Sequence, residues 1–123
     1  MDRAAHLLPL VRRSPDWLAA PRLAIVVGID DPDGRNRVQL RLVGCEEAER
    51  QDAPLWARVV CPFAGNDRGA FLMPDVDDEV LVVFHNGDPA CPLVIGGLWN
   101  GSASAPATLG PDNRLKVIRS RRG

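Results

Sequence analysis

The sequence has no tyrosine, two histidines, and three cysteines that form no Cys-X-X-Cys pair. Cys45, Cys61 and Cys91 are odd in number and widely spaced, which disfavours both a complete set of disulfides and a cysteine-based metal site. We expect free thiols, as is typical of a reducing compartment. His6 and His85 adjoin no plausible nucleophile, and no serine fits a nucleophile-elbow pattern. We therefore predict no catalytic residue, no bound metal and no cofactor.

Long hydrophobic runs are also missing. No apolar stretch approaches the roughly 20 residues that a helix needs to span a bilayer. The short apolar stretch at residues 7–11 is followed by Arg12 and Arg13, whereas the charges of a signal peptide precede its apolar segment. We expect a protein made in the cytoplasm, without a membrane anchor.

A strong net charge is absent as well, since 15 basic and 16 acidic residues give −1 at pH 7. The whole chain therefore offers no basic field to nucleic acid or anionic lipid. The distribution is uneven, because the last ten residues carry five positive charges and no acid. These charges belong to Arg114, Lys116, Arg119, Arg121 and Arg122. The residues before them consequently carry a net charge of −6.

The periodicity of the apolar residues predicts a single all-β domain. A chain of 123 residues is long enough for one core. Val38, Leu40 and Leu42 alternate with polar residues, as in a half-buried strand, and Asp33-Gly34 supplies a hairpin turn before them. Five short strands separated by turn signals favour a small Greek-key barrel. The predicted strands are residues 23–29, 37–43, 55–61, 79–85 and 92–98, with residues 62–78 crossing an end of the barrel.

Both flanks differ in composition from the predicted barrel at residues 21–101. Residues 1–20 have a weak helical pattern interrupted by Pro9 and Pro15, which fits a docking arm, a short cap on the barrel or a partly disordered terminus. Residues 102–123 begin with a Ser/Ala/Pro linker, and one short apolar stretch, with Leu115, Val117 and Ile118, follows it. A lone strand is unstable in water. We expect this stretch to pair with the barrel edge, with a partner, or with its own copies.

An acidic cluster, Asp75, Asp77, Asp78 and Glu79, presents two alternatives. Closely spaced carboxylates suit hard cations such as Ca²⁺. The cluster has no EF-hand spacing, however, and acids in a solvated turn also prevent edge-to-edge strand pairing. We favour the solvated turn.

Five short motifs follow one another along the predicted barrel. They are Trp56-Ala57-Arg58-Val59, Pro62-Phe63-Ala64-Gly65, Pro74-Asp75-Val76-Asp77-Asp78-Glu79-Val80, Gly87-Asp88-Pro89 and Gly97-Leu98-Trp99-Asn100. In this order they resemble the oligomer-binding-fold (OB-fold) domain of contractile-tail spike proteins, a family that includes phage baseplate assembly protein V and its relatives in type VI secretion and extracellular injection particles. The resemblance covers about residues 23–101, and the tail resembles the family's entry into a trimeric β-helix.

The chain departs from the family's pattern in two places. Asp77 stands where the family usually has glycine, which puts the shape of that turn in doubt, because aspartate accepts a left-handed conformation less readily than glycine. The sequence also ends at Gly123, where larger relatives begin the β-helix. We therefore expect a short spike or a spike base whose tip comes from another protein.

The resemblance implies a structural role and no enzymatic activity. It implies a homotrimer at the centre of a baseplate, plugging the tube and joining the hub ring to a separate PAAR-like tip protein. Leu115, Val117, Ile118 and Arg119 would form the trimer or tip interface. The particle would be a phage tail or injection device, delivered outside the cell on firing or release. The alternative is an OB-fold module for single-stranded nucleic acid, which the scarcity of aromatic residues disfavours.

Overall fold

The computed structural model describes residues 20–44 and 54–123, and this part of the chain is all-β. Its strands are β1 (Arg22–Gly28), β2 (Val38–Val43), β3 (Leu55–Val59), β4 (Ala64–Gly65), β5 (Arg68–Gly69), β6 (Glu79–Phe84) and β7 (Pro92–Leu98). One 3-10 turn, η1 (His85–Gly87), joins β6 to β7. The predicted N-terminal arm lies outside the described residues, except for Ala20, as do His6 and Cys45.

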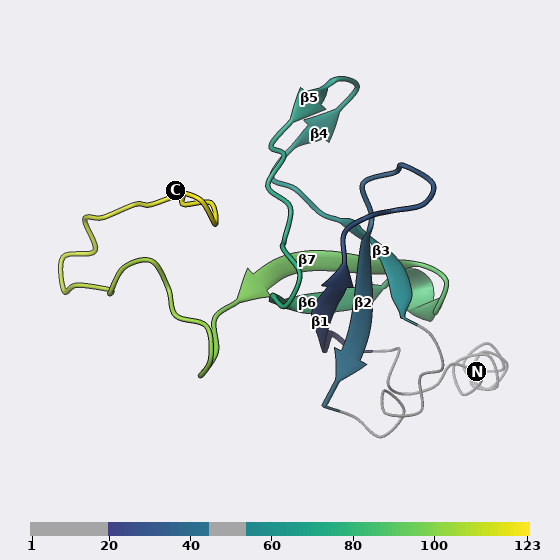
Figure 1. The fold of residues 1–123 in the computed structure, drawn as a ribbon, viewed down its shortest axis with the longest axis horizontal. Coiled ribbons are helices and arrows are strands. Elements are labelled where there is room, and N and C mark those ends of the chain that lie inside the picture. The colour runs from purple at the N-terminus through teal and green to yellow at the C-terminus, as the bar shows by residue number, and fades with distance from the viewer. Residues whose placement is uncertain (1–19, 45–53) are drawn as a thin grey trace, which may run out of the picture.

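Five of the strands form a closed barrel in the order β1-β2-β3-β7-β6, with β6 paired back to β1 (Figure 1). All neighbours are antiparallel except β3 and β7, which run parallel with Arg58 opposite Leu93 and Val59 opposite Val94. A five-stranded Greek-key barrel with mixed pairing is the OB fold. The predicted all-β five-stranded barrel is therefore confirmed.

The apolar side chains of the alternating pattern fill the barrel interior. Val38, Leu40 and Leu42 of β2 are buried, as the period of two requires. Along β6, Val80 and Val82 point into the core, while the residues that alternate with them, Glu79, Leu81 and Val83, are half-buried. The core consists of Ala24, Val26, Val38, Leu40, Leu42, Ala57, Val80, Val82, Phe84 and Val94.

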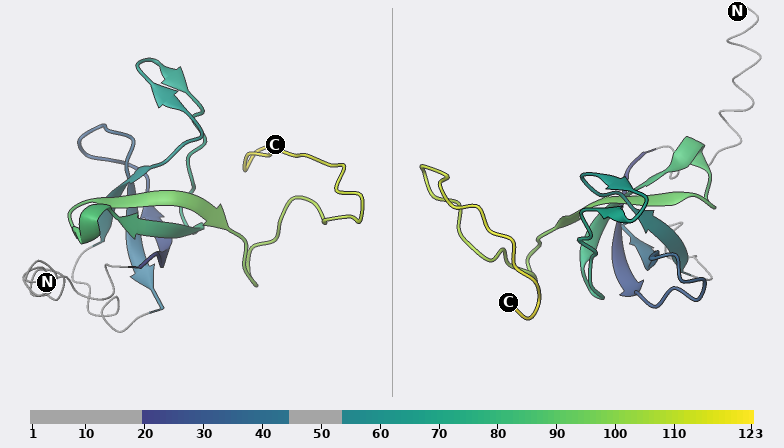
Figure 2. Two further views of the ribbon diagram at one scale, coloured as in Figure 1. Left: turned by 180° about the vertical axis from the view of Figure 1, so that it is seen from behind. Right: turned by 90° about the horizontal axis from the view of Figure 1, so that it is seen from above.

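The segment between β3 and β6 holds more structure than a simple crossover. Residues 64–69 form a two-stranded hairpin, β4–β5, which projects from the barrel (Figures 1 and 2). Strands of two residues are too short to produce a detectable period in the sequence. The five predicted strands differ from the observed barrel strands by at most two residues at an end.

The C-terminal tail forms no strand in this single chain. It leaves the end of β7 and curves back toward the side of the barrel that carries the β4–β5 hairpin (Figure 1). All residues from Gly101 to Gly123 are exposed. No backbone hydrogen bond joins residues 114–119 to the described part of the barrel. Pairing of this stretch with a partner or with its own copies stays a prediction.

Candidate assembly surfaces

Within residues 20–44 and 54–123, no three histidine, cysteine or acidic side chains are grouped so that they could hold a metal ion. Cys61 and Cys91 are free thiols. No helix in the same ranges is long and apolar enough to cross a membrane. The notable surfaces are two grooves on the barrel that share no lining residue.

The first groove lies between the β1–β2 loop and the β6–β7 loop, and we call it the arginine groove. Its volume is about 620 Å³. Residues of β3 and the start of β7 form its floor, and the two loops form its walls. It is lined by Arg35, Arg37, Trp56, Arg58, His85, Ala90, Cys91, Pro92 and Leu93.

Asp31 holds the β1–β2 wall of the arginine groove in place. Its carboxylate accepts hydrogen bonds from the backbone N–H groups of Asp33, Arg35 and Arg37, at 2.9, 3.1 and 3.1 Å. It also receives Nε and Nη2 of Arg37, each at 2.9 Å, in a bidentate pair. The Asp31 side chain is only 3% exposed. Arg37 and these backbone donors together outweigh burial and hold the pKa of Asp31 well below its ordinary value.

Arg37 links this loop to the floor of the groove. Its guanidinium carbon lies 5.7 Å from the ring centroid of Trp56, a cation–π contact, and its Nη2 lies 3.0 Å from Oδ2 of Asp33. The hydrogen bond to Asp31 raises the pKa of Arg37. Arg58 follows Trp56 by two residues on β3, so both side chains lie on the same face of the strand. The aromatic-X-Arg motif thus supplies the floor.

The β6–β7 wall is a tight turn built by the Gly-Asp-Pro motif. Asn86 and Gly87 have φ values of 55° and 68°, so the turn needs residues that tolerate a left-handed backbone. Oδ1 of Asp88 accepts the N–H of Ala90 at 2.9 Å, and the N–H of His85 donates to the carbonyl of Cys91 at 3.0 Å. Burial, followed by the nearby Asp88 carboxylate, raises the pKa of the Cys91 thiol.

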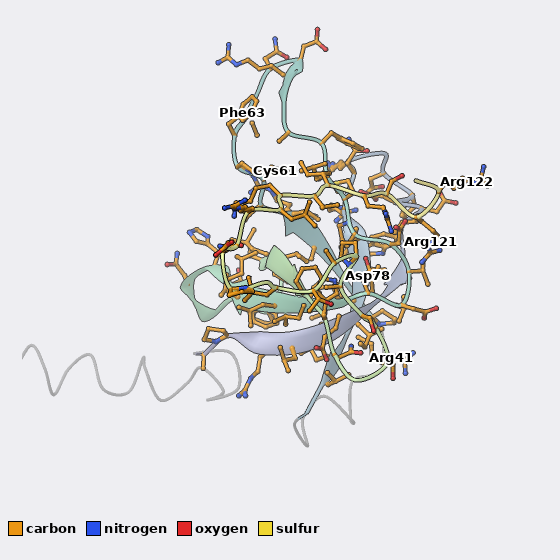
Figure 3. The ribbon with its side chains drawn as sticks, turned by 90° about the vertical axis from the view of Figure 1, so that its left-hand side faces the viewer. Arg41, Cys61, Phe63, Asp78, Arg121 and Arg122 are labelled. Atoms are coloured by element: carbon orange, nitrogen blue, oxygen red, sulfur yellow. The ribbon has the colours of Figure 1, made fainter. Side chains whose placement is uncertain are left out.

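The second groove, which we call the apolar groove, lies where β3 and β7 separate. Its volume is about 490 Å³, and Phe71 and Leu72 on its wall are 70% and 57% exposed. The end of the tail closes one side of it, and Nη2 of Arg121 donates to the carbonyl of Val76 at 3.2 Å (Figure 3). It is lined by Val59, Val60, Phe71–Asp75, Asp78, Val80, Val94, Gly96, Gly97 and Ile118–Arg121.

The acidic turn beside the apolar groove is structural. The N–H of Asp78 donates to the carbonyl of Asp75 at 3.1 Å, and Oδ2 of Asp78 accepts the N–H of Asp75 at 2.8 Å. Asp77 occupies the third position of this turn with φ 78°, the left-handed value of a type II turn. Two backbone bonds with Val26, at 2.8 and 2.9 Å, tie the turn to β1. The turn therefore has the left-handed backbone that favours glycine, with aspartate at that position.

The predicted motif residues fall into three groups. Trp56 and Arg58 lie in the arginine groove, with Gly87, Asp88 and Pro89 in the turn beside it. Pro74, Asp78 and Gly97 line the apolar groove, and Glu79 begins β6 next to it. Trp99 is exposed beyond β7 near Leu115 and Val117 of the tail, whereas Ile118 and Arg119 reach the apolar groove.

Sequence reasoning missed the ionic network of the β1–β2 loop. The segment Asp31-Pro32-Asp33-Gly34 predicts a turn, and the φ of 63° at Gly34 confirms it. The part that Asp31 plays depends on Arg37, six residues later, folding back over the loop. An aspartate that begins a turn and is followed by an arginine at the start of a strand was the available signal.

Comparison with known proteins agrees with this geometry. Residues 22–99 match the family described as the type VI secretion system/phage-baseplate injector OB domain. The chain is 34% identical over 71 residues to the type VI secretion system spike protein VgrG3 of Vibrio cholerae, covering 58% of this chain and 7% of that protein. It is 34% identical over 89 residues to VgrG4b of Pseudomonas aeruginosa, also a type VI secretion system spike protein, covering 72% and 11%.

A third relative extends the similarity along nearly the whole chain. The type VI secretion system spike protein VgrG5 of Pseudomonas aeruginosa is 30% identical over 121 residues, which is 94% of this chain and 15% of that protein. The chain thus spans only a small part of the length of these curated relatives. With its closed barrel and the family match over residues 22–99, the chain belongs to the type VI secretion system/phage-baseplate injector OB-domain family, a structural family of baseplate and spike components.

Proposed function

We propose that this chain is a spike or baseplate-centre subunit that plugs the end of the tube in a contractile tail or injection system. In this role it joins the hub ring to a separate PAAR-like tip protein and leaves the cell with the particle on firing or release. Residues 21–101 act as the barrel, residues 1–20 as an arm and residues 102–123 as the connection to neighbouring subunits. Membership of the injector family and similarity to proteins named as spike proteins support the proposal.

The tail is the observation that supports assembly into a homotrimer. Leu115 is 63% exposed and Ile118 is 87% exposed, and the stretch around them has no strand partner in the single chain. Apolar side chains and unpaired backbone groups are both stabilised when a neighbouring copy covers them. Leu115, Val117, Ile118 and Arg119 are therefore the proposed interface between copies or with the tip protein. The arginines of the tail would point outward or meet acids of a neighbour.

Removal of residues 112–123 tests the role of the tail. We expect the shortened protein to keep the circular dichroism spectrum of the barrel and to lose the trimer, as measured by light scattering. A matched control replaces residues 102–108 with a Gly/Ser linker of equal length, which should leave the trimer intact. A shortened protein that is still trimeric would contradict the proposed interface, and a full-length protein that is monomeric would contradict the trimer itself.

Binding of single-stranded nucleic acid is the alternative function. The arginine groove lies on the strands and loops that OB folds use for ligands. A stacking platform needs several exposed aromatic faces, however. Among the described residues, Trp56 is the only Phe or Trp side chain that lines the groove, and Arg37 lies over its ring. The groove is therefore better suited to another anionic ligand.

A further inference from the structure

We propose that the arginine groove binds an extended acidic segment of a partner protein, with carboxylates on Arg35 and Arg58 and apolar side chains between them. The identity of the partner, a neighbouring subunit of the injector, rests on the proposed function. The recognition itself rests only on the groove.

The positive charge available to a ligand comes from two of the three arginines. Arg37 is held by Asp31 and Asp33, so it contributes shape more than free charge. Arg35 and Arg58 are exposed, and neither side chain forms an ion pair with the described residues. A guanidinium without a partner presents a planar set of donors that matches a carboxylate.

Both walls of the groove are already fixed in the unbound chain. Asp31 holds the β1–β2 loop through three backbone N–H groups and Arg37. Asp88 closes the β6–β7 turn through the N–H of Ala90, and the N–H of Cys91 donates to its carbonyl at 3.0 Å. A site whose loops are fixed loses little conformational entropy when a ligand binds.

The lining favours a peptide over a nucleic acid. Pro92, Leu93 and Ala90 offer apolar contacts beside the arginines, which suits a segment that alternates acidic and aliphatic residues. The charge of the whole molecule is consistent with this choice. With a net charge of −1 the chain has no excess of positive charge for a long polyanion, whereas a short acidic segment needs only Arg35 and Arg58.

The test measures binding of a fluorescein-labelled peptide of alternating glutamate and leucine to the full-length chain, by fluorescence anisotropy at low salt. We expect salt-sensitive binding that shifts the NMR signal of the Trp56 indole N–H and leaves that of Trp99 unchanged. Arg58→Gln should weaken binding about fivefold, roughly the loss of one exposed ionic contact. Arg58→Lys should weaken it less, because the charge remains while the planar donors are lost.

Arg41→Gln is the matched control, since Arg41 is exposed on β2 and does not line the groove (Figure 3). No binding by the wild-type chain, or an equal loss in the Arg41 and Arg58 variants, would overturn the proposal. Tighter binding of labelled oligo-dT that depends on Arg58 would replace the acidic segment with nucleic acid. None of these outcomes changes the oligomeric state, so the trimer test separates failure of the proposed function from failure of this site.

Discussion

The strand β6 and the C-terminal tail both contain aliphatic residues, and their surroundings are very different. Val80 and Val82 of β6 are 0% exposed, whereas Leu115 and Ile118 of the tail are mostly exposed. β6 is hydrogen-bonded to β1 on one side and to β7 on the other. The tail has no strand on either side. A run of aliphatic residues thus becomes a buried strand only where two neighbours satisfy its backbone.

The same comparison can be made within β7. Its first half lies between β3 and β6, with Val94 buried. After the bulge at Ile95, its second half pairs only with β6, and Leu98 is exposed. On the side from which the tail departs, β7 therefore extends past β3 and has a strand on one side only. The exposed apolar residues of this half of β7 and of the tail follow one another along the chain, from a strand with one neighbour to a stretch with none.

The largest predicted difference between the two regions concerns folding stability. Leu40→Ala should lower the free energy of unfolding by about 2–5 kcal/mol, because it removes a fully buried side chain and leaves a cavity. Ile118→Ala should change the unfolding of the barrel by less than about 0.5 kcal/mol, because that side chain is exposed. Urea unfolding followed by circular dichroism measures both values.

These two variants should be measured at a protein concentration where the chain is monomeric. If Ile118→Ala destabilises the monomer as much as Leu40→Ala does, the tail packs on its own barrel, and the contrast between the regions is wrong. If its effect appears only when the concentration is raised, the side chain acts between copies.

The barrel could be predicted from the sequence, because its signals are local. The alternation at Val38, Leu40 and Leu42 fixes the buried face of β2, and the turn at Gly34 fixes the hairpin. The pairing of Asp31 with Arg37 could not be predicted, because it depends on how the loop folds back in space. The β4–β5 hairpin was missed because its strands are too short to show a period. The tail's apolar pattern favours a strand, yet pairing needs a neighbour that a single sequence does not specify.

A smaller effect should follow from loss of the ionic network in the β1–β2 loop. Asp31→Asn should lower the thermal midpoint at pH 7 by less than Leu40→Ala does. The pKa of Asp31 is lowered in the folded chain, so its carboxylate stabilises the fold above the ordinary carboxyl pKa of about 4. That contribution is lost as the pH falls from there through the folded pKa. The midpoints of the variant and the wild type should therefore converge in acid.

Asp30→Asn is the control for this experiment, because Asp30 is an exposed neighbour whose side chain forms no hydrogen bond or ion pair with the described residues. Its midpoint should follow that of the wild type at every pH. A constant gap between Asp31→Asn and the wild type down to strong acid would mean that ionisation of Asp31 does not stabilise the loop.

The smallest effect concerns the backbone at Asp77. Its φ of 78° is unfavourable for a residue with a Cβ, and its N–H already donates to Val26, so the turn cannot relax without losing contact with β1. Asp77→Gly should raise the free energy of unfolding by about 0.5 kcal/mol, and Asp77→Ala should lower it by about as much, since alanine tolerates this conformation less well than aspartate. Asp77→Asn separates the backbone effect from the charge effect. Like aspartate, asparagine can adopt the left-handed region, so the main change is the loss of one of four neighbouring negative charges. If Asn stabilises the chain as much as Gly does in urea unfolding, repulsion among the acids is the cause and the backbone explanation fails.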